Sequence, residues 1–268
     1  MTNITMVDFL KAHPSGGINQ SVENPGFTKV LKAFDNPTTL NKSTFAESTF
    51  SDWAGSVLRI KDYYQSEVPA LDPKSEYKLE VQTAAIQAAK VAANQKYADT
   101  VGRMKERVAQ EKQALRTSIV EKKYPLYSAR QKSQLGNITT VSNLPDMQAR
   151  AIGAQEMTMA ASIPLKHISR RLLENYAAQG RIDLTSALIE RAALNMNELK
   201  LENYQEVYSY AHEFYDKIGI TEDRQVLKKI EAIEKFVIEP AATSNEGKIA
   251  YSEPAFAAEI AKDNLLEH

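Results

Sequence analysis

Residues 74–124 contain no proline and a single glycine, Gly102. Because proline and glycine interrupt helices, an interval of this length favours one continuous helix. With Ser75 near its start and Tyr124-Pro125 as its stop, the helix would contain about 48 residues and be about 70 Å long. A chain organised around such a helix is expected to be all-α.

Apolar residues recur along this interval at helical spacing, but they do not form a strict heptad repeat. Glu111 falls on the apolar seam, and the phase of the repeat slips near Asn94. We therefore expect the long helix to pack against several partner helices instead of forming an isolated two-stranded coiled coil. The alanine-rich stretch 84–98 would allow close contact between helices.

The rest of the chain divides into segments by its breakers and composition. We expect short helices in residues 1–73 that pack on the long helix, and the long basic, alanine-rich helix in 74–135. A C-terminal helical bundle follows in 136–239. Residues 240–268 are expected to form a loosely attached tail that ends in a tag remnant, Glu267-His268. The predicted architecture is an elongated, all-α protein with one very long central helix and a C-terminal bundle.

Periodicity also predicts individual helices. Thr44–Glu67 is expected to be one helix, with a further helical arm at 126–135. The bundle is expected to contain helices at 146–162, 167–179, 183–196, 198–218 and 222–238.

The sequence lacks the common signatures of catalysis. It has no cysteine, which excludes disulfides, thiolate catalysis and cysteine-bound zinc. Neither a Gly-x-Ser-x-Gly motif nor a glycine-rich phosphate loop is present. His212 and Asp216 share a helix face, but one histidine and one carboxylate favour a solvated ion pair over a metal site. We expect no catalytic residues, no metal and no cofactor, and hence no enzyme.

The chain is expected to be soluble and cytoplasmic. Residues 1–10 lack the basic start and apolar run of a signal peptide, and no uncharged apolar window of 18 residues occurs. No transmembrane segment or contact with a membrane surface is expected. Secretion without a signal, or a place in a virion, stays open as an alternative.

The overall charge of −1 conceals two oppositely charged parts. Residues 74–135 carry +7, whereas residues 181–268 carry −7. Two interpretations follow: the basic and acidic parts pair with each other within the molecule, or they attract different partners. The first is the simpler.

The basic residues of the middle part form the most distinctive candidate site. Several repeat at i, i+4 on the predicted helix, which suits a phosphate backbone. Glu106, Glu111 and Glu121 interrupt the pattern, so a solvated helix surface is the simpler interpretation. The candidate polyanion-binding residues are Arg103, Arg107, Lys112, Arg116, Lys122, Lys123, Arg130 and Lys132.

Tyrosines concentrate in the predicted helix 198–218. Tyr204, Tyr208 and Tyr215 follow one another at i, i+4 and i+11 and are candidate partner-binding residues. Core packing is the simpler explanation for them, since buried aromatic residues dominate helical cores.

Three functional hypotheses follow from these patterns. The first is a non-enzymatic helical assembly, scaffold or protein-interaction component that binds a protein partner or self-associates. The second is a nucleic-acid-binding protein that uses the basic helix. The third is a secreted helical effector or pore-forming protein, suggested by the methionine-containing stretch 157–161.

Overall fold

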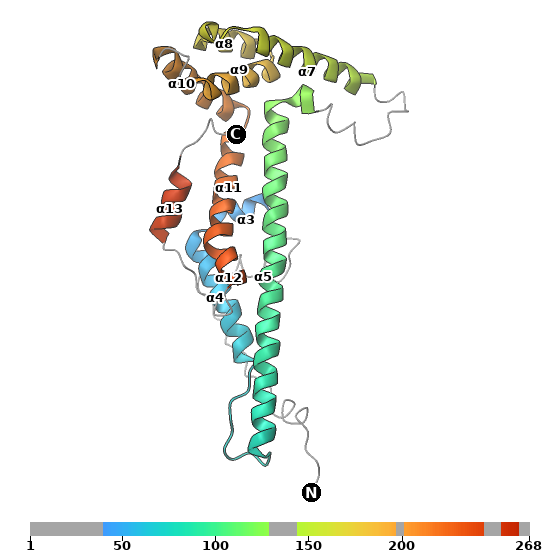
Figure 1. Ribbon diagram of the computed structural model, residues 1–268, viewed down its shortest axis with the longest axis vertical. Helices are drawn as coiled ribbons and strands as arrows, with labels where there is room; N and C mark the ends of the chain where they lie inside the picture. The colour runs from blue at the N-terminus through green and yellow to red at the C-terminus, as the bar shows by residue number, and fades with distance from the viewer. Residues whose placement is uncertain (1–39, 129–143, 197–200, 244–252, 263–268) are drawn as a thin grey trace. The chain divides into compact units, whose positions relative to one another are not determined.

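The structure is a computed structural model that describes residues 40–128, 144–196, 201–243 and 253–262. Within these residues the fold is all-α and contains no strand, with one long helix and a C-terminal set of helices, as predicted. Figure 1 shows these helices with the labels used below. Their bounds are α3 (Lys42–Glu47), α4 (Phe50–Ser66), α5 (Leu79–Lys123), α7 (Leu144–Ser162), the 3-10 turn η3 (Leu165–His167), α8 (Arg170–Ala178), α9 (Ile182–Leu194), α10 (Leu201–Lys217), α11 (Ile220–Ile233), the π-helical turn η5 (Glu234–Ile238), α12 (Glu239–Thr243) and α13 (Glu253–Ala261).

The chain divides into two compact units that do not coincide with the four sequence segments. Unit 1 contains the residues up to Lys112 together with Lys228–Ala261, and unit 2 contains Gln113–Leu227. Helices α5 and α11 each supply residues to both units.

Helix α5 has 45 residues, which corresponds to about 67 Å. One stripe of its side chains is buried at intervals of three, four, seven and eight residues, as expected for a helix that packs on one side. The buried apolar residues are Ala85, Ala93, Tyr97, Val101, Met104, Val108, Leu115 and Ile119. The helix ends at Lys123 because Pro125 disfavours the helical conformation of the residue before it.

The first turns of α5 bury a glutamine, Gln82, in the same stripe. The Gln82 side chain donates to the Tyr77 carbonyl (2.8 Å) and accepts from the Asp72 backbone N–H (3.0 Å). These bonds satisfy the polar groups of the chain that enters the helix. The stripe consequently follows the register of Gln82, Ala85 and Ala93, and Val91 is left 60% exposed.

In unit 1, helix α4 packs on the first half of α5. The Tyr64 hydroxyl lies 3.1 Å from the Thr100 hydroxyl, and Lys96 pairs with Glu67 at 2.5 Å. The helix expected at Thr44–Glu67 is divided in two, because Thr49 caps a new helix. Its side chain accepts from the Asp52 N–H, and the Asp52 carboxylate accepts from the Thr49 N–H. Together the two bonds form a capping box.

Helix α13 falls in the segment that we expected to be a loosely attached tail, yet its Phe256 is 6% exposed. The Phe256 ring lies 4.9 Å from the Phe50 ring of α4 and 6.4 Å from the Phe236 ring of η5. Burial of a phenylalanine on both neighbours attaches this helix to unit 1.

In unit 2, helices α7 to α10 share one core with the last turns of α5 (Figure 1). Helix α9 contacts α7, α8 and α10, and its Leu184, Leu188 and Ile189 have no exposed surface. The helices begin and end close to the predicted positions. Two differences are that α8 begins at Arg170 after a separate 3-10 turn, and that α11 passes into the π-helical turn η5 after Ile233. The expected helical arm 126–135 lies mostly outside the described residues, although 125–128 form a helical turn.

Two glycines in the left-handed region mark the turns that separate helices of unit 2. Gly180, between α8 and α9, has φ of 72°, and Gly219, between α10 and α11, has φ of 71°. A side chain is disfavoured in this conformation because its Cβ approaches the following carbonyl oxygen.

We predict that Gly180→Ala lowers the free energy of unfolding by about 1 kcal/mol. A Cβ at Gly180 would meet no atom within 4 Å, so the cost comes from the backbone alone. The matched control is Gly102→Ala in α5, which also enters open space but in helical conformation. It should raise stability by about 0.5–1 kcal/mol. Urea unfolding followed by circular dichroism measures both, and equal effects would contradict the conformational argument.

Candidate interaction site

The end of α5 is held in unit 2 by an ion pair whose ammonium group is almost removed from water. Lys123 is 2% exposed, and its Nζ donates to Oε1 of Glu190 in α9 at 2.6 Å. The other carboxylate oxygen, Oε2, accepts from the Tyr124 hydroxyl. Both oxygens of Glu190 therefore bind the end of α5. We call Lys123, Tyr124 and Glu190 the polar junction.

Burial dominates the electrostatics of the polar junction. It lowers the pKa of Lys123, and the Glu190 carboxylate opposes this effect. Burial also raises the pKa of Tyr124 above its ordinary value, and the Glu190 charge acts in the same direction. The nearby Tyr215 ring lies 5.5 Å from Lys123 Nζ, and burial raises the pKa of this tyrosine as well. The Glu190 carboxylate and the face of the Tyr215 ring both favour the charged form of Lys123.

Titratable groups with shifted pKa values can mark an active site, so we considered whether the polar junction could be catalytic. A lysine nucleophile must reach a substrate, but the Lys123 side chain is 3% exposed and its Nζ is bonded to Glu190. The arrangement fits an anchor that fixes the end of α5 on α9.

A second carboxylate of α9 holds the chain just beyond α5. Asp183 is 1% exposed and accepts from the backbone N–H groups of Leu126 (3.2 Å) and Tyr127 (2.8 Å). Burial raises the pKa of Asp183, while these two hydrogen bonds act to lower it. The turn after α5 is therefore fixed against the first turn of α9.

Helix α7 passes directly over this turn. A Cβ on Gly153 would lie 2.7 Å from the Tyr127 nitrogen and 2.9 Å from the Leu126 carbonyl carbon, so only glycine fits there. At the other end of α7, Arg191 of α9 donates to the Ile163 carbonyl (2.8 Å) and to the Ala160 carbonyl. In the middle, Arg181 pairs with the buried Glu156 at 2.9 Å. Helix α7 is attached along its inner side.

The outer side of α7 carries no charge. Every exposed residue between 147 and 162 is apolar or a neutral polar residue, and Met147 and Ile152 are 49% and 48% exposed. The charged residues of this interval lie elsewhere on the helix: Glu156 is buried and Arg150 is half-buried. We call the exposed set the uncharged face; it consists of Met147, Gln148, Ala151, Ile152, Gln155, Thr158, Ala161 and Ser162.

Sequence reasoning did not identify the uncharged face. The signal was available, because residues 147–162 contain only two charged residues. On a helix, neither Arg150 nor Glu156 lies on the side that carries Gln148, Ala151 and Gln155. The sequence did not show which side of the helix faces the core, because this depends on the contact between Gly153 and the turn after α5.

The structure places the candidate polyanion-binding residues in different environments. Three of them form internal ion pairs: Lys112 with Glu234, Lys122 with Asp223 at 2.6 Å, and Lys123 with Glu190. Each joins the basic part of the sequence to the acidic C-terminal part, which is the internal pairing that the charge distribution suggested. Lys122 also donates to the Gly219 carbonyl at 2.7 Å.

The other candidate cations are not brought together into one cluster by these contacts. Arg103 and Arg116 are exposed, and Arg107 is half-buried and donates to Gln110 at 2.9 Å. Arg130 and Lys132 lie outside the described residues. Polyanion binding stays a prediction.

The three candidate tyrosines also separate. Tyr215 is 1% exposed and belongs to the core of unit 2. Tyr204 and Tyr208 are half-buried, with ring centroids 6.1 Å apart. The Tyr208 ring meets the His212 ring edge-on at 4.5 Å. Core packing accounts for Tyr215, and the other two leave part of their surface at the side of α10.

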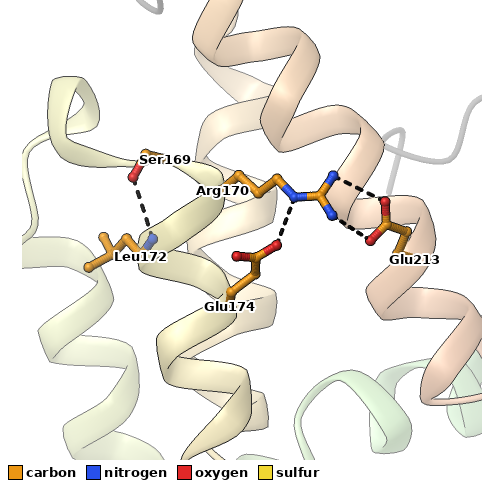
Figure 2. Close-up of polar contacts among 5 residues, drawn as sticks. All are labelled: Ser169, Arg170, Leu172, Glu174 and Glu213. Atoms are coloured by element: carbon orange, nitrogen blue, oxygen red, sulfur yellow. Dashed lines mark hydrogen bonds and ion pairs between the residues drawn. The ribbon is translucent and has the colours of Figure 1, made fainter.

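The exposed ion pairs of unit 2 contrast with the polar junction. Figure 2 shows Arg170 at the start of α8, where its guanidinium binds Glu174 at 2.7 Å and Glu213 of α10 at 2.8 Å. The Ser169 side chain caps the same helix by accepting from the Leu172 N–H. The carboxylates are about half exposed, so water screens this pair.

Among the residues that the structure describes, no group of three histidine, aspartate or glutamate side chains is placed to hold a metal ion. No helix in this part of the chain combines the length and the apolar character needed to cross a bilayer.

Comparison with known proteins gives no relative for this chain: no family model, no curated protein and no solved structure matches it.

We predict that Glu190→Gln lowers the free energy of unfolding by about 2–3 kcal/mol, because it removes the charge of the carboxylate that pairs with the buried ammonium of Lys123. Adding Lys123→Met should recover most of this loss, since the buried charge is then also removed. Glu213→Gln, in the exposed pair with Arg170, is the matched control and should have a much smaller effect. Urea unfolding of the parent chain, Glu190→Gln, Lys123→Met and the double variant provides the double-mutant cycle. Additive single effects would contradict the anchoring role of the polar junction.

Proposed function

We propose that the chain is a non-enzymatic helical assembly component that binds another protein through the uncharged face of α7. The observation that carries this proposal is the absence of charge from every exposed position of α7 between residues 147 and 162. The cores of protein interfaces are depleted of charged residues, whereas ordinary protein surfaces are rich in them.

The exposed residues of α10, another helix of unit 2, differ from those of α7. Helix α10 has nearly the same length as α7 and exposes Glu206, Glu213, Asp216 and Lys217. Solvated surface is therefore charged on one helix of unit 2 and uncharged on another. Exposed Met147 and Ile152 add apolar surface to the uncharged face, which favours a protein partner.

The attachments of α7 support the same function. Gly153 packs on the turn after α5, Glu156 pairs with Arg181, and Arg191 holds the end of the helix. A face presented by a fixed helix loses little conformational freedom on binding, which favours affinity.

The two alternatives receive less support. Nucleic-acid binding would use cations on α5, of which Lys112, Lys122 and Lys123 are already paired with carboxylates. A pore-forming protein would release the stretch 157–161, yet Ala160 is 1% exposed and Met157 and Met159 pack against the core of unit 2.

Photo-crosslinking in the cells that make the protein naturally tests the proposal. A photoreactive amino acid at Gln155 should give discrete protein adducts, because this residue lies in the middle of the uncharged face. The matched control replaces Ser209, an exposed neutral residue of α10. Ala151→Glu should abolish the adducts formed from position 155, because it would bury a charge in the contact. Absence of adducts at position 155, or equal adducts at position 209, would contradict the proposal.

A further inference from the structure

We propose that the uncharged face binds a second copy of the chain, with two α7 helices packed antiparallel about a two-fold axis near residue 153. This inference rests on the proposed function and names its partner. It follows from the spacing, charge and size of the residues on the uncharged face.

The spacing is that of a helix seam. Gln148, Ala151, Gln155, Thr158 and Ser162 follow one another at alternating intervals of three and four residues, and all are exposed. This is the spacing of the a and d positions along which two helices pack, here occupied by small and neutral polar residues instead of large apolar ones. The seam extends over most of α7, which has 19 residues and is about 28 Å long.

The charge of the face suits a copy of itself. A two-fold axis brings each residue near the same set of residues on the partner, so any charge would face its own sign nearby. The uncharged face carries none. A partner of strong charge would gain no complementary contact from this surface, whereas a second copy meets a surface of the same chemistry.

The sizes of the seam residues fit the antiparallel direction. With the axis at residue 153, the centre of α7, Ala151 faces Gln155 of the second copy and Gln148 faces Thr158 of the second copy. Each layer then joins a long side chain to a shorter one, and neither places two glutamines together. A parallel arrangement would instead pair Gln148 with Gln148 and Gln155 with Gln155, which fits less closely.

The exposed apolar residues occupy the flanks of the same arrangement. In an antiparallel pair the axis brings Ile152 next to Ile152 of the second copy, and Met147 next to Ala161 of the second copy. Burial of side chains that are 48% and 49% exposed supplies the apolar contribution.

The area of the uncharged face limits the affinity of the dimer. One pair of helices of this length buries less than the roughly 800 Å² per partner of a stable complex. The dimer should therefore be weak and should form as the protein concentration rises toward about 1 mM, which corresponds to about 4 kcal/mol of association free energy.

Disulfide crosslinking tests both the partner and the direction, and the chain contains no cysteine to interfere. In the antiparallel pair, residue 148 of one chain lies beside residue 158 of the other. Two copies of residue 148, or of residue 158, would be about 15 Å apart along the axis. A disulfide requires Cα atoms within about 7 Å. Mild oxidation of a mixture of Gln148→Cys and Thr158→Cys proteins should give a mixed dimer, and neither protein alone should crosslink. Ile152→Cys alone should crosslink, because it lies at the axis.

The control is Ser209→Cys on α10, which should stay monomeric under the same oxidation. Efficient crosslinking of Gln148→Cys and of Thr158→Cys, each by itself, would overturn the antiparallel arrangement. Failure of Ile152→Cys and of the mixed pair would overturn the second copy as the partner. In that case a photo-crosslinked adduct of α7 with a different protein would leave the proposed function standing, so the two failures are distinguishable.

Discussion

The arrangement of unit 2 depends on two carboxylates of α9. Glu190 binds Lys123 and Tyr124 at the end of α5, and Asp183 binds the backbone of the turn that follows. Because Lys123 and Asp183 are buried, loss of either carboxylate would remove hydrogen bonds that water does not readily replace, and such losses cost more than the net value of an intact bond. The position of α7 follows from this anchor, since Gly153 packs on the same turn.

The same contacts explain the opposite charges of the two sequence parts. Cations near the end of α5 meet carboxylates of α9 and α11, and Lys112 meets Glu234. Some of the cations that the sequence offered as polyanion-binding residues are therefore paired with carboxylates inside each unit. What distinguishes the exposed surface of α7 is therefore the lack of charge, which favours contact with protein over contact with phosphate.

The sequence was sufficient for most of the helices but not for the proposed binding surface. A proline-free interval predicted α5. Gly180 and Gly219 occupy turns because left-handed backbone favours glycine. The division at Thr49 was missed, although Thr49 and Asp52 have the capping-box spacing. The burial of Gln82 and Lys123 could not be read from periodicity, because each is compensated by a partner outside its own helix turn: the loop at Asp72 for one and Glu190 for the other. The uncharged face could not be identified from periodicity either, because contacts from α9 and from the turn after α5 decide which side of α7 is exposed.

The most direct test of the account is sedimentation equilibrium of the unmodified chain and of Ala151→Glu over a wide range of protein concentrations, at low and high salt. The account predicts that the average mass of the unmodified chain rises from 29.9 kDa toward twice that value, equally at both salt concentrations, because the contact involves no charge. Ala151→Glu should stay at the monomer mass. A constant monomer mass for both proteins, or an identical rise for both, would contradict the assignment of the uncharged face of α7 as the surface of self-assembly.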